Sequence, residues 1–387
     1  MKWEYKTLDE LGEVSRGRSK HRPRNDPALF GGKYPFVQTA DVKNANLYLT
    51  QYTDTCNEKG LEQSKLWHPG TLCITIAANI ADTAILGIDA CFPDSVMGFI
   101  PYEGVSNVKY VKYAFDMLQR DFKQISQGTA QDNLSWQKLS TIRFPTPPIE
   151  TQDQIVNIAS AYDDFIENNQ KQIKLLEEAA QRLYKEWFID LRFPGYETTP
   201  VHDGVPEEWS WGTVDEVIEY HDKKRKPLSS AERVQFQGNF KYYGAAGVLD
   251  HVKEYLFDGI FLLFGEDGTV ITPDGYPVLQ YVSGQFWVNN HAHVLTGKAC
   301  YSTEYIYMMF KNIKVSDVVT GVAQPKISQA RLSAKKILIP ERNLVLKYSE
   351  IINPYMQMVL ALQEQNEQLI EARDRLLPKL MSGEIEV

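Results

Sequence analysis

Residues 150–192 read ETQDQIVNIASAYDDFIENNQKQIKLLEEAAQRLYKEWFIDLR, and this stretch decides the architecture of the chain. It contains neither proline nor glycine after its first residue. Apolar residues recur at alternating steps of three and four, with one asparagine among them: Ala159, Tyr162, Ile166, Asn169, Ile173, Leu176, Ala180, Leu183 and Trp187. This pattern is an a/d heptad seam, which predicts a long helix and a partner helix for it. One helix of about 40 residues would be roughly 60 Å long at 1.5 Å per residue.

The partner helix is expected at the far end of the chain, where the seam recurs. Tyr162 corresponds to Tyr355, an offset of 193 positions, and the second seam is Ile352, Tyr355, Val359, Leu362, Asn366, Leu369, Arg373, Leu376 and Leu380. Each seam contains one asparagine, Asn169 or Asn366, and a buried asparagine can fix the register of a coiled coil at some cost in stability. Two unrelated amphipathic helices, each packed on its own core, are the alternative interpretation.

The segments that lead into the two seams repeat at the same offset. Gly128-Thr129-Ala130-Gln131 matches Gly321-Val322-Ala323-Gln324, and Phe144-Pro145-Thr146-Pro147 matches Ile337-Leu338-Ile339-Pro340. The domain starts repeat as well: Trp3, Tyr5, Thr7 and Glu10 match Trp209, Trp211, Thr213 and Glu216. The chain is therefore predicted to be a tandem duplication of a globular domain followed by a long helix.

Composition limits the class of protein. A chain of 387 residues that is 43% hydrophobic and 24% charged suits two soluble globular domains. It has no apolar run of transmembrane length, and Lys2, Glu4 and Lys6 do not fit a secretory leader. The four cysteines have no CxxC spacing, which favours a reducing cytoplasm without disulfides or zinc. The formal net charge of −9 argues against nucleic acid only weakly, because the local field of each domain decides DNA binding.

Two basic loops are candidate DNA contacts. The first contains Arg16, Arg18, Lys20, Arg22 and Arg24, a cation at every other residue. The second, near the matching place in the second half, contains Lys223, Lys224, Arg225 and Lys226. Solvated surface loops are the alternative. We favour contacts with DNA because Arg forks suit both phosphate and guanine, and because cationic loops occur in both repeats.

The rest of each domain is predicted to be mixed α+β. Residues 3–14 are expected to form a short helix, with Thr7 as N-cap and Glu10 as its capping-box partner, and residues 108–124 another helix. Strands are expected at residues 34–38, 71–76, 84–88, 95–100, 241–243, 260–264, 286–288 and 291–294.

Three other motifs are weak. His291 and His293 share one strand face, but without a third ligand a packed or DNA-contacting pair is favoured over a metal site. Residues 264–268, FGEDG, lack nucleotide-binding spacing, so Glu266 and Asp267 are only possible acceptors for a cytosine amino group. Residues 353–356, NPYM, are similar to an amino-methyltransferase motif but lack its second proline. We find no Walker loop, nucleophile elbow or catalytic carboxylate pair, which favours a binding protein.

The repeated ends resemble a known family. Residues 128–148, Glu150-Thr151-Gln152, the first seam, Trp187-Phe188 and residues 193–196, FPGY, look like the central conserved region of type I restriction–modification specificity subunits. Residues 377–385, LPKLMSGEI, resemble that family's distal conserved region. One departure lies in the second lead-in, where Glu341-Arg342-Asn343 stands opposite Pro148-Ile149-Glu150, so distal partner contacts can differ there.

The resemblance implies a fold and a division of labour. Two mixed α/β target-recognition domains in tandem repeat would be separated by two long antiparallel coiled-coil helices. Each domain would read one half of a bipartite, asymmetric DNA site through the major groove. The expected boundaries are 1–149 for the first domain, 150–192 for its coil helix, 193–204 for a linker, 205–340 for the second domain, and 341–387 for the second coil helix and tail.

Partners and cofactors follow from the same resemblance. The helices would dock two methyltransferase subunits that methylate adenine at N6 with S-adenosylmethionine, and restriction subunits with ATP-driven translocase activity would join them. S-adenosylmethionine, ATP and magnesium are thus expected in partner subunits, and this chain would be a non-catalytic, cytoplasmic component of phage defence. A self-sufficient DNA-modifying enzyme and a coiled-coil scaffold without a DNA role are the competing hypotheses.

Overall fold

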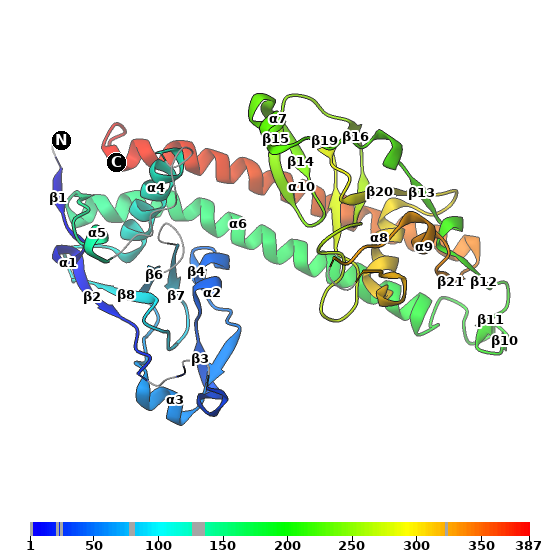
Figure 1. The fold of residues 1–387 in the computed structure, drawn as a ribbon, viewed down its shortest axis with the longest axis horizontal. Coiled ribbons are helices and arrows are strands. Elements are labelled where there is room, and N and C mark those ends of the chain that lie inside the picture. The colour runs from blue at the N-terminus through cyan, green and yellow to red at the C-terminus, as the bar shows by residue number, and fades with distance from the viewer. Residues whose placement is uncertain (1–2, 21–22, 24–25, 77–81, 126–135, 322–323) are drawn as a thin grey trace. The chain divides into compact units, whose positions relative to one another are not determined.

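The computed structural model describes residues 3–20, 23, 26–76, 82–125, 136–321 and 324–387 (Figure 1). The chain forms two compact units: unit 1 is Met1–Glu167 with Glu367–Val387, and unit 2 is Asn168–Asn366. The boundary crosses both long helices, α6 (Ile149–Tyr184) and α10 (Arg342–Ser382), so each unit combines one mixed domain with a stretch of each helix. The predicted domain ends at residues 149 and 340 fall near the starts of these helices.

Unit 1 is built around a five-stranded sheet with the order β2-β8-β6-β7-β4. Only its β4–β7 pair is parallel. Two-stranded sheets β1–β9 and β3–β5 accompany it. The strands are β1 (Glu4–Lys6), β2 (Gly12–Arg16), β3 (Phe30–Phe36), β4 (Tyr48–Leu49), β5 (Asp54–Cys56), β6 (Leu72–Thr75), β7 (Thr83–Leu86), β8 (Val96–Pro101) and β9 (Phe144–Thr146). The helices are α1 (Leu8–Leu11), η1 (Pro27–Leu29), α2 (Thr39–Asn44), α3 (Glu58–Gln63), α4 (Val108–Ile125) and α5 (Trp136–Leu139).

The core of unit 1 lies between its sheet and its helices. Strands β6 and β7 are buried along their whole length, as expected for central strands that are covered on both faces. Helix α4 contributes Tyr110, Val111, Ala114 and Phe115 to one apolar cluster with them. The same cluster includes Ile155 and Ala159 of α6 and Leu377, Leu380 and Met381 of α10. The long helices are thus part of the domain's own core.

Unit 2 contains two four-stranded sheets. The first, β13-β20-β17-β18, is antiparallel, and the second, β15-β14-β19-β16, has one parallel pair, β14–β19. The strands are β10 (Val201–His202), β11 (Val205–Pro206), β12 (Ser210–Thr213), β13 (Ile218–Tyr220), β14 (Gln237–Tyr243), β15 (Val248–Val252), β16 (Phe257–Asp258), β17 (Phe261–Gly265), β18 (Leu279–Val282), β19 (Gln285–Val288), β20 (Ala292–Gly297) and β21 (Lys336–Ile339). The helices are η3 (Lys185–Ile189), η4 (Val214–Glu216), η5 (Asp222–Lys224), α7 (Ser230–Gln235), α8 (Thr303–Asn312), η6 (Ser316–Val318) and α9 (Gln329–Ser333).

The structure repeats where the sequence does. Ribbon β1–β9 pairs Tyr5 with Pro145, and ribbon β12–β21 pairs Trp211 with Leu338, the residues at matching positions. In both repeats a threonine N–H at the end of the first ribbon strand, β1 or β12, donates to the side chain of a glutamate three residues on: Thr7 to Glu10 at 2.7 Å and Thr213 to Glu216 at 2.8 Å. The prediction of one helix within residues 3–14 was too long, because strands β1 and β2 flank the four-residue α1.

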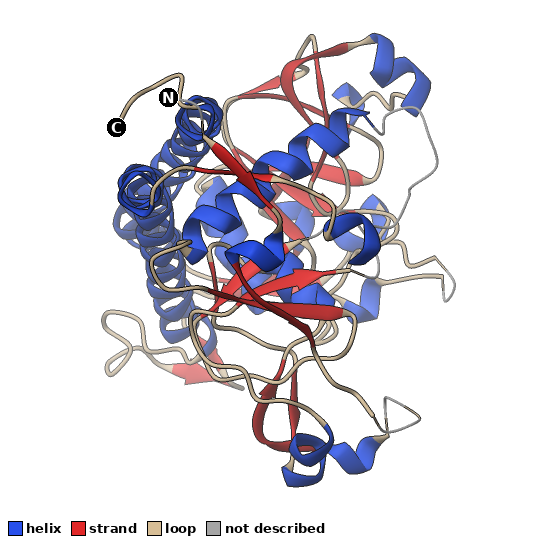
Figure 2. Cartoon of the chain, turned by 90° about the vertical axis from the view of Figure 1, so that its left-hand side faces the viewer, coloured by secondary structure: helices blue, strands red, loops and turns tan. Residues whose placement is uncertain are grey.

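The predicted long helices are present, and in each unit their segments lie side by side in opposite directions (Figure 1 and Figure 2). In unit 2, the buried Asn169 Nδ2 donates to Asn366 Oδ1 at 3.0 Å and to Gln365 Oε1 at 2.8 Å. Nearer the domain, the Tyr348 hydroxyl donates to the carbonyl oxygen of Ala180 at 2.9 Å. From the first contact to the second, the residue number rises along α6, from Asn169 to Ala180, and falls along α10, from Asn366 to Tyr348. The two helices are therefore antiparallel.

The predicted seam residues differ in burial. Ile166, Asn169, Val359, Leu362 and Asn366 are buried, and the half-buried ones are Tyr162, Ile173, Leu176, Leu183, Leu369 and Leu376. Tyr355 is 39% exposed, whereas Met356 is fully buried. The assignment of Tyr355 to the seam was wrong because the apolar face of α10 steps from Ile352 by four residues and then by three, which places Met356 on it.

The first helix also ends earlier than predicted. One turn of π-helix, η3, follows α6, and Leu191 takes the left-handed backbone conformation with φ 57°, which ends a helix. Among the described residues, no helix is both long enough and apolar enough to cross a membrane. All four cysteines are free thiols.

Candidate nucleic-acid interface

The first basic loop alternates between outward and inward residues. Arg16, Arg18 and Lys20 are exposed, whereas Gly17 and Ser19 between them are buried. In extended backbone, successive side chains point to opposite sides, so the three cations share one face. Among the described residues, no carboxylate is paired with any of the three. The loop therefore presents unneutralised positive charge to solvent.

Close packing at Gly17 holds this loop against the domain. The Gly17 N–H donates to the carbonyl oxygen of Val96 at 2.9 Å. A Cβ at Gly17 would lie 2.3 Å from the carbonyl oxygen of Phe92, so only glycine fits the approach. The two other predicted contacts in this loop, Arg22 and Arg24, lie outside the described residues.

The second basic loop contains three exposed lysines and one arginine that is held in ion pairs. Lys223 and Lys224, in η5, and Lys226 are exposed. The side chain of Arg225 is only 13% exposed. The three lysines remain available as DNA contacts, whereas Arg225 belongs to the interior of the unit.

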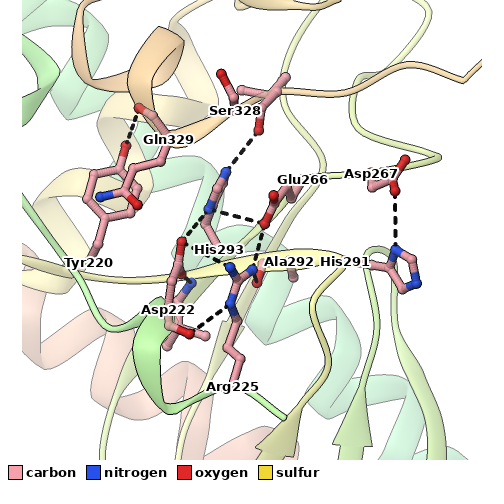
Figure 3. Close-up of polar contacts among 12 residues, drawn as sticks. Tyr220, Asp222, Arg225, Glu266, Asp267, His291, Ala292, His293, Ser328 and Gln329 are labelled. Carbon is pink, nitrogen blue, oxygen red and sulfur yellow. Dashed lines mark hydrogen bonds and ion pairs between the residues drawn. The ribbon is translucent and has the colours of Figure 1, made fainter. Parts of the chain in front are cut away.

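Arg225 is the centre of an ion-pair network (Figure 3). Its Nη1 donates to Glu266 Oε2 and to the carbonyl oxygen of Ala292, both at 2.6 Å, and its Nη2 lies 3.3 Å from Asp222 Oδ2. Lys326 Nζ lies 3.4 Å from Glu266 Oε1. These ion pairs disfavour the predicted DNA contact of Arg225, because reaching a phosphate would take the guanidinium away from two largely buried carboxylates. Arg225 instead fixes the loop that carries the lysines.

His293 completes the network from the buried side. Its Nδ1 lies 2.6 Å from Asp222 Oδ2, and its Nε2 lies 2.9 Å from the carbonyl oxygen of Ile327. A carbonyl can only accept, so Nε2 carries the hydrogen of that bond. The Tyr220 ring packs edge-on against this imidazole at 5.6 Å. Burial raises the pKa of Tyr220 to about 12, so its hydroxyl stays protonated and donates to the carbonyl oxygen of Gln329 at 3.4 Å.

The network also tests the prediction that the two histidines form no metal site. Among the described residues, one set of potential ligands is closely grouped: Asp222, Glu266 and His293 have ligand atoms within 4.8 Å of one another. His291 is not among them. Arg225 already neutralises both carboxylates at hydrogen-bond distance, so the group is built as a protein ion-pair network, and a metal ion would have to displace the guanidinium.

A second polar group lies beside this network, and sequence reasoning did not assign its Gln324 to a site. Gln324 Nε2 donates to Asp267 Oδ1 at 2.9 Å, and His291 Nδ1 lies 3.6 Å from Asp267 Oδ2. Gln324 is exposed and the His291 side chain is 46% exposed. Figure 3 shows Asp267 and His291 facing each other at the edge of the buried network. The available signal was the duplicated quartet that ends in Gln131 and Gln324; Gln131 lies outside the described residues.

The predicted acceptors of the 264–268 turn are not free. Glu266 is occupied by Arg225 and Lys326, and Asp267 by Gln324 and His291. Their role as acceptors for a cytosine amino group stays a prediction. The turn instead organises the side chains around it.

Comparison with known proteins places these features in a family. The family described as "Type I restriction modification DNA specificity domain" matches residues 1–178 and 206–372. The MjaIX specificity subunit of a type I restriction enzyme from Methanocaldococcus jannaschii is 25% identical over 412 aligned positions, which cover 100% of this chain and 94% of that protein. A putative type I restriction enzyme specificity subunit from Haemophilus influenzae is 33% identical over 146 positions, or 38% of this chain and 37% of that protein.

A solved structure shows the same fold. The crystal structure of a type I restriction–modification S subunit from M. genitalium aligns with 98% of this chain and 96% of its own, with a TM-score of 0.53 and 17% sequence identity. The family match covers both repeats. It includes the duplicated segments that form the ribbons β1–β9 and β12–β21 and most of the two long helices. The chain belongs to the family of type I restriction–modification DNA specificity subunits.

Proposed function

We propose that this chain reads a bipartite, asymmetric DNA site, one half with the domain of each unit, and scaffolds methyltransferase and restriction subunits in the cytoplasm. The observation that carries the proposal is the family match over both repeats, each of which presents exposed cations beside its sheet. Phosphate neutralisation by lysine and arginine supplies much of the affinity of such surfaces. The divergent domain middles suit two different half-sites.

In this proposal the chain itself performs no chemistry. Methyl transfer with S-adenosylmethionine, and ATP- and magnesium-dependent translocation and cleavage, belong to partner subunits. The largely buried carboxylates of unit 2, Asp222 and Glu266, are held in ion pairs, which suits a structural role. Methyl transfer by the purified chain, free of partner subunits, would support the competing hypothesis of a self-sufficient enzyme.

The deciding experiment maps methylated adenines in the host with and without this gene. We expect methylation at one split sequence, present only when this chain and its methyltransferase are both produced. Unchanged methylation, together with a purified complex that binds all duplexes equally, would favour the coiled-coil scaffold without a DNA role.

Two sets of substitutions assign the half-sites. Replacing Arg16, Arg18 and Lys20 by Ala in the assembled methyltransferase should lower the log–log salt slope of binding by about 0.9 per lost phosphate contact. Any loss of sequence preference should fall in one half-site. Replacing Lys223, Lys224 and Lys226 by Ala should act on the other half-site, so each set serves as the matched control of the other. Wild-type affinity and slope in both sets would exclude these loops from the DNA interface.

A further inference from the structure

Gln324, which donates to Asp267, lies in a loop that backbone hydrogen bonds hold in place. The Thr320 N–H and the Lys326 N–H each donate to the other residue's carbonyl oxygen at 2.8 Å and form the base of a hairpin. Gly321 lies at its turn with φ 82°, and a Cβ there would come 2.4 Å from the carbonyl oxygen of Gln324. Only glycine suits this backbone, which accounts for the glycine that begins the quartet.

The hairpin is fastened to the 266–268 turn beside the ion-pair network. The Gly268 N–H donates to the carbonyl oxygen of Pro325 at 3.0 Å, and the Ile327 N–H to that of Glu266 at 2.9 Å. Glu266 is bound in turn to Arg225 of the second basic loop. The exposed lysines and the hairpin are therefore held by one set of contacts at one end of the β13-β20-β17-β18 sheet.

Asp267 sets the orientation of the Gln324 amide. A carboxylate can only accept, so the nitrogen of the amide faces it, and one N–H is used. Within the part of the chain that the structure describes, this is the one hydrogen bond of the Gln324 side chain. A second N–H and the Oε1 acceptor remain, side by side, on an exposed residue. A glutamine with this donor–acceptor pair matches the N6 amino group and N7 of adenine in the major groove.

We propose that Gln324, held by Asp267, reads one adenine of the half-site bound by unit 2. The inference rests on the proposed function and adds to it the residue and the base. Asp267 acts through Gln324 and is a positioning residue, and the lysines of the second basic loop supply sequence-independent attraction to the adjoining phosphates.

The test uses the full chain assembled with its methyltransferase subunits and a duplex library randomised across the half-sites. Gln324→Ala should reduce the preference for adenine over other bases at one position by about 5- to 150-fold, with the other half-site unchanged. Gln324→Glu loses the second donor and should lose the same preference. Asp267→Asn keeps an acceptor for the amide and should retain more of the preference than Asp267→Ala.

A matched control is available in the same unit. Gln285 Nε2 donates to Asp258 Oδ2 at 3.0 Å, an exposed Gln–Asp pair at the far end of β19 from the basic loop. Gln285→Ala should leave every base preference unchanged. Thermal melting of each complex checks that the variants are folded.

The outcomes separate this inference from the function on which it rests. A uniform loss of affinity for all sequences with Gln324→Ala would identify a phosphate contact and overturn the adenine assignment, and so would an unchanged preference. Both leave the wild-type complex sequence-specific. A wild-type complex without any sequence preference would instead overturn the proposed function.

Discussion

The two repeats join their domains to the long helices through matched positions with opposite chemistry. In unit 1, the Tyr113 hydroxyl donates to Asp163 Oδ2 at 2.5 Å, and Arg373 Nη1 pairs with Asp163 Oδ1. The side chains of Asp163 and Arg373 are 12% and 23% exposed. Burial, together with the charge of Asp163, raises the pKa of Tyr113 far above its usual value, so the phenol stays a donor.

In unit 2 the positions that match Asp163 and Arg373, 193 residues away, are apolar. They are Met356 and Ala180, and both are fully buried. Around them the junction is filled by Tyr184, Phe188, Tyr305 and Tyr348, whose rings contact one another edge-on or tilted. One backbone arrangement is thus held by a charged network in one copy and by apolar packing in the other.

The difference shows what a buried ion pair contributes. Desolvation of the two charges offsets most of their attraction, so a well-packed apolar set can hold the same junction about as strongly. Removing one partner is different, because it leaves a buried charge without compensation. The two junctions should therefore respond very unequally to single and to combined substitutions.

The largest effect is expected for Arg373→Ala. It leaves Asp163 buried without its cation, and we expect unit 1 to lose about 3–5 kcal/mol of its free energy of unfolding. Urea denaturation, with hydrogen exchange to locate the loss in unit 1, measures it. A loss below about 1 kcal/mol would show that water replaces the guanidinium.

The matched control imports the apolar set of unit 2. The triple variant Tyr113→Phe, Asp163→Met and Arg373→Ala removes the charges and the phenol hydroxyl together, so it should be clearly more stable than Arg373→Ala alone. If the triple variant is no more stable than the single one, the two junctions are not interchangeable.

The asparagine pair should show a smaller effect. Asn169→Ala leaves the buried Asn366 Oδ1 without its donor, at an expected cost of about 1–3 kcal/mol. The repeat relates Asn169 to Leu362 and Asn366 to Ile173, so the double variant Asn169→Leu and Asn366→Ile introduces the apolar pairing. That double variant should regain the loss in chemical denaturation. An equal loss in both variants would mean that the bond itself stabilises the helices.

A single hydroxyl in the junction of unit 2 should matter less. Tyr348→Phe keeps the ring but removes the hydrogen bond to the Ala180 carbonyl, and we expect a loss of about 1 kcal/mol. Burial raises the pKa of Tyr348 well above its usual value, so the donor stays protonated and the loss should be equal at pH 6 and pH 9. Tyr196→Phe, at a 43% exposed tyrosine, should change nothing. A loss that vanishes at pH 9 would mean that Tyr348 ionises.

Labelling of the cysteines, which needs no substitution, compares the accessibility of thiols in the two units. Burial, reinforced by the neighbouring Cys91, raises the pKa of Cys56 to about 12, and burial also raises the pKa of Cys73 and Cys91. These three thiols of unit 1 should resist iodoacetamide at pH 8, because the thiolate is the reactive form. The half-buried Cys300 of unit 2 should react first, and all four should react in urea. Rapid labelling of Cys73 in the native chain would contradict its burial.

The sequence predicted the features that depend on local residue patterns. The heptad seams and the strands are signals within short windows, and the 193-residue repeat is a direct match of such windows; the long helices and mixed domains followed from them. The errors lie where distant residues decide. The side chain of Arg225 is directed by Glu266 and Ala292, and the partner of Gln324 is a turn residue 57 positions earlier. Steps of three and four residues fit more than one rotation of α10 about its axis. The sequence therefore did not decide whether Tyr355 or Met356 faces the core.

The interleaved composition of the units has a consequence for biosynthesis. Unit 2 is one continuous segment, whereas unit 1 needs Leu377, Leu380 and Met381 to complete a core that begins at Leu8. A ribosome adding about 5–20 residues per second makes all of residues 168–366 between the two parts of unit 1. The domain that emerges first must therefore wait on the order of ten seconds or more for its last residues. The second domain can fold before the first, which reverses the usual order of folding during translation.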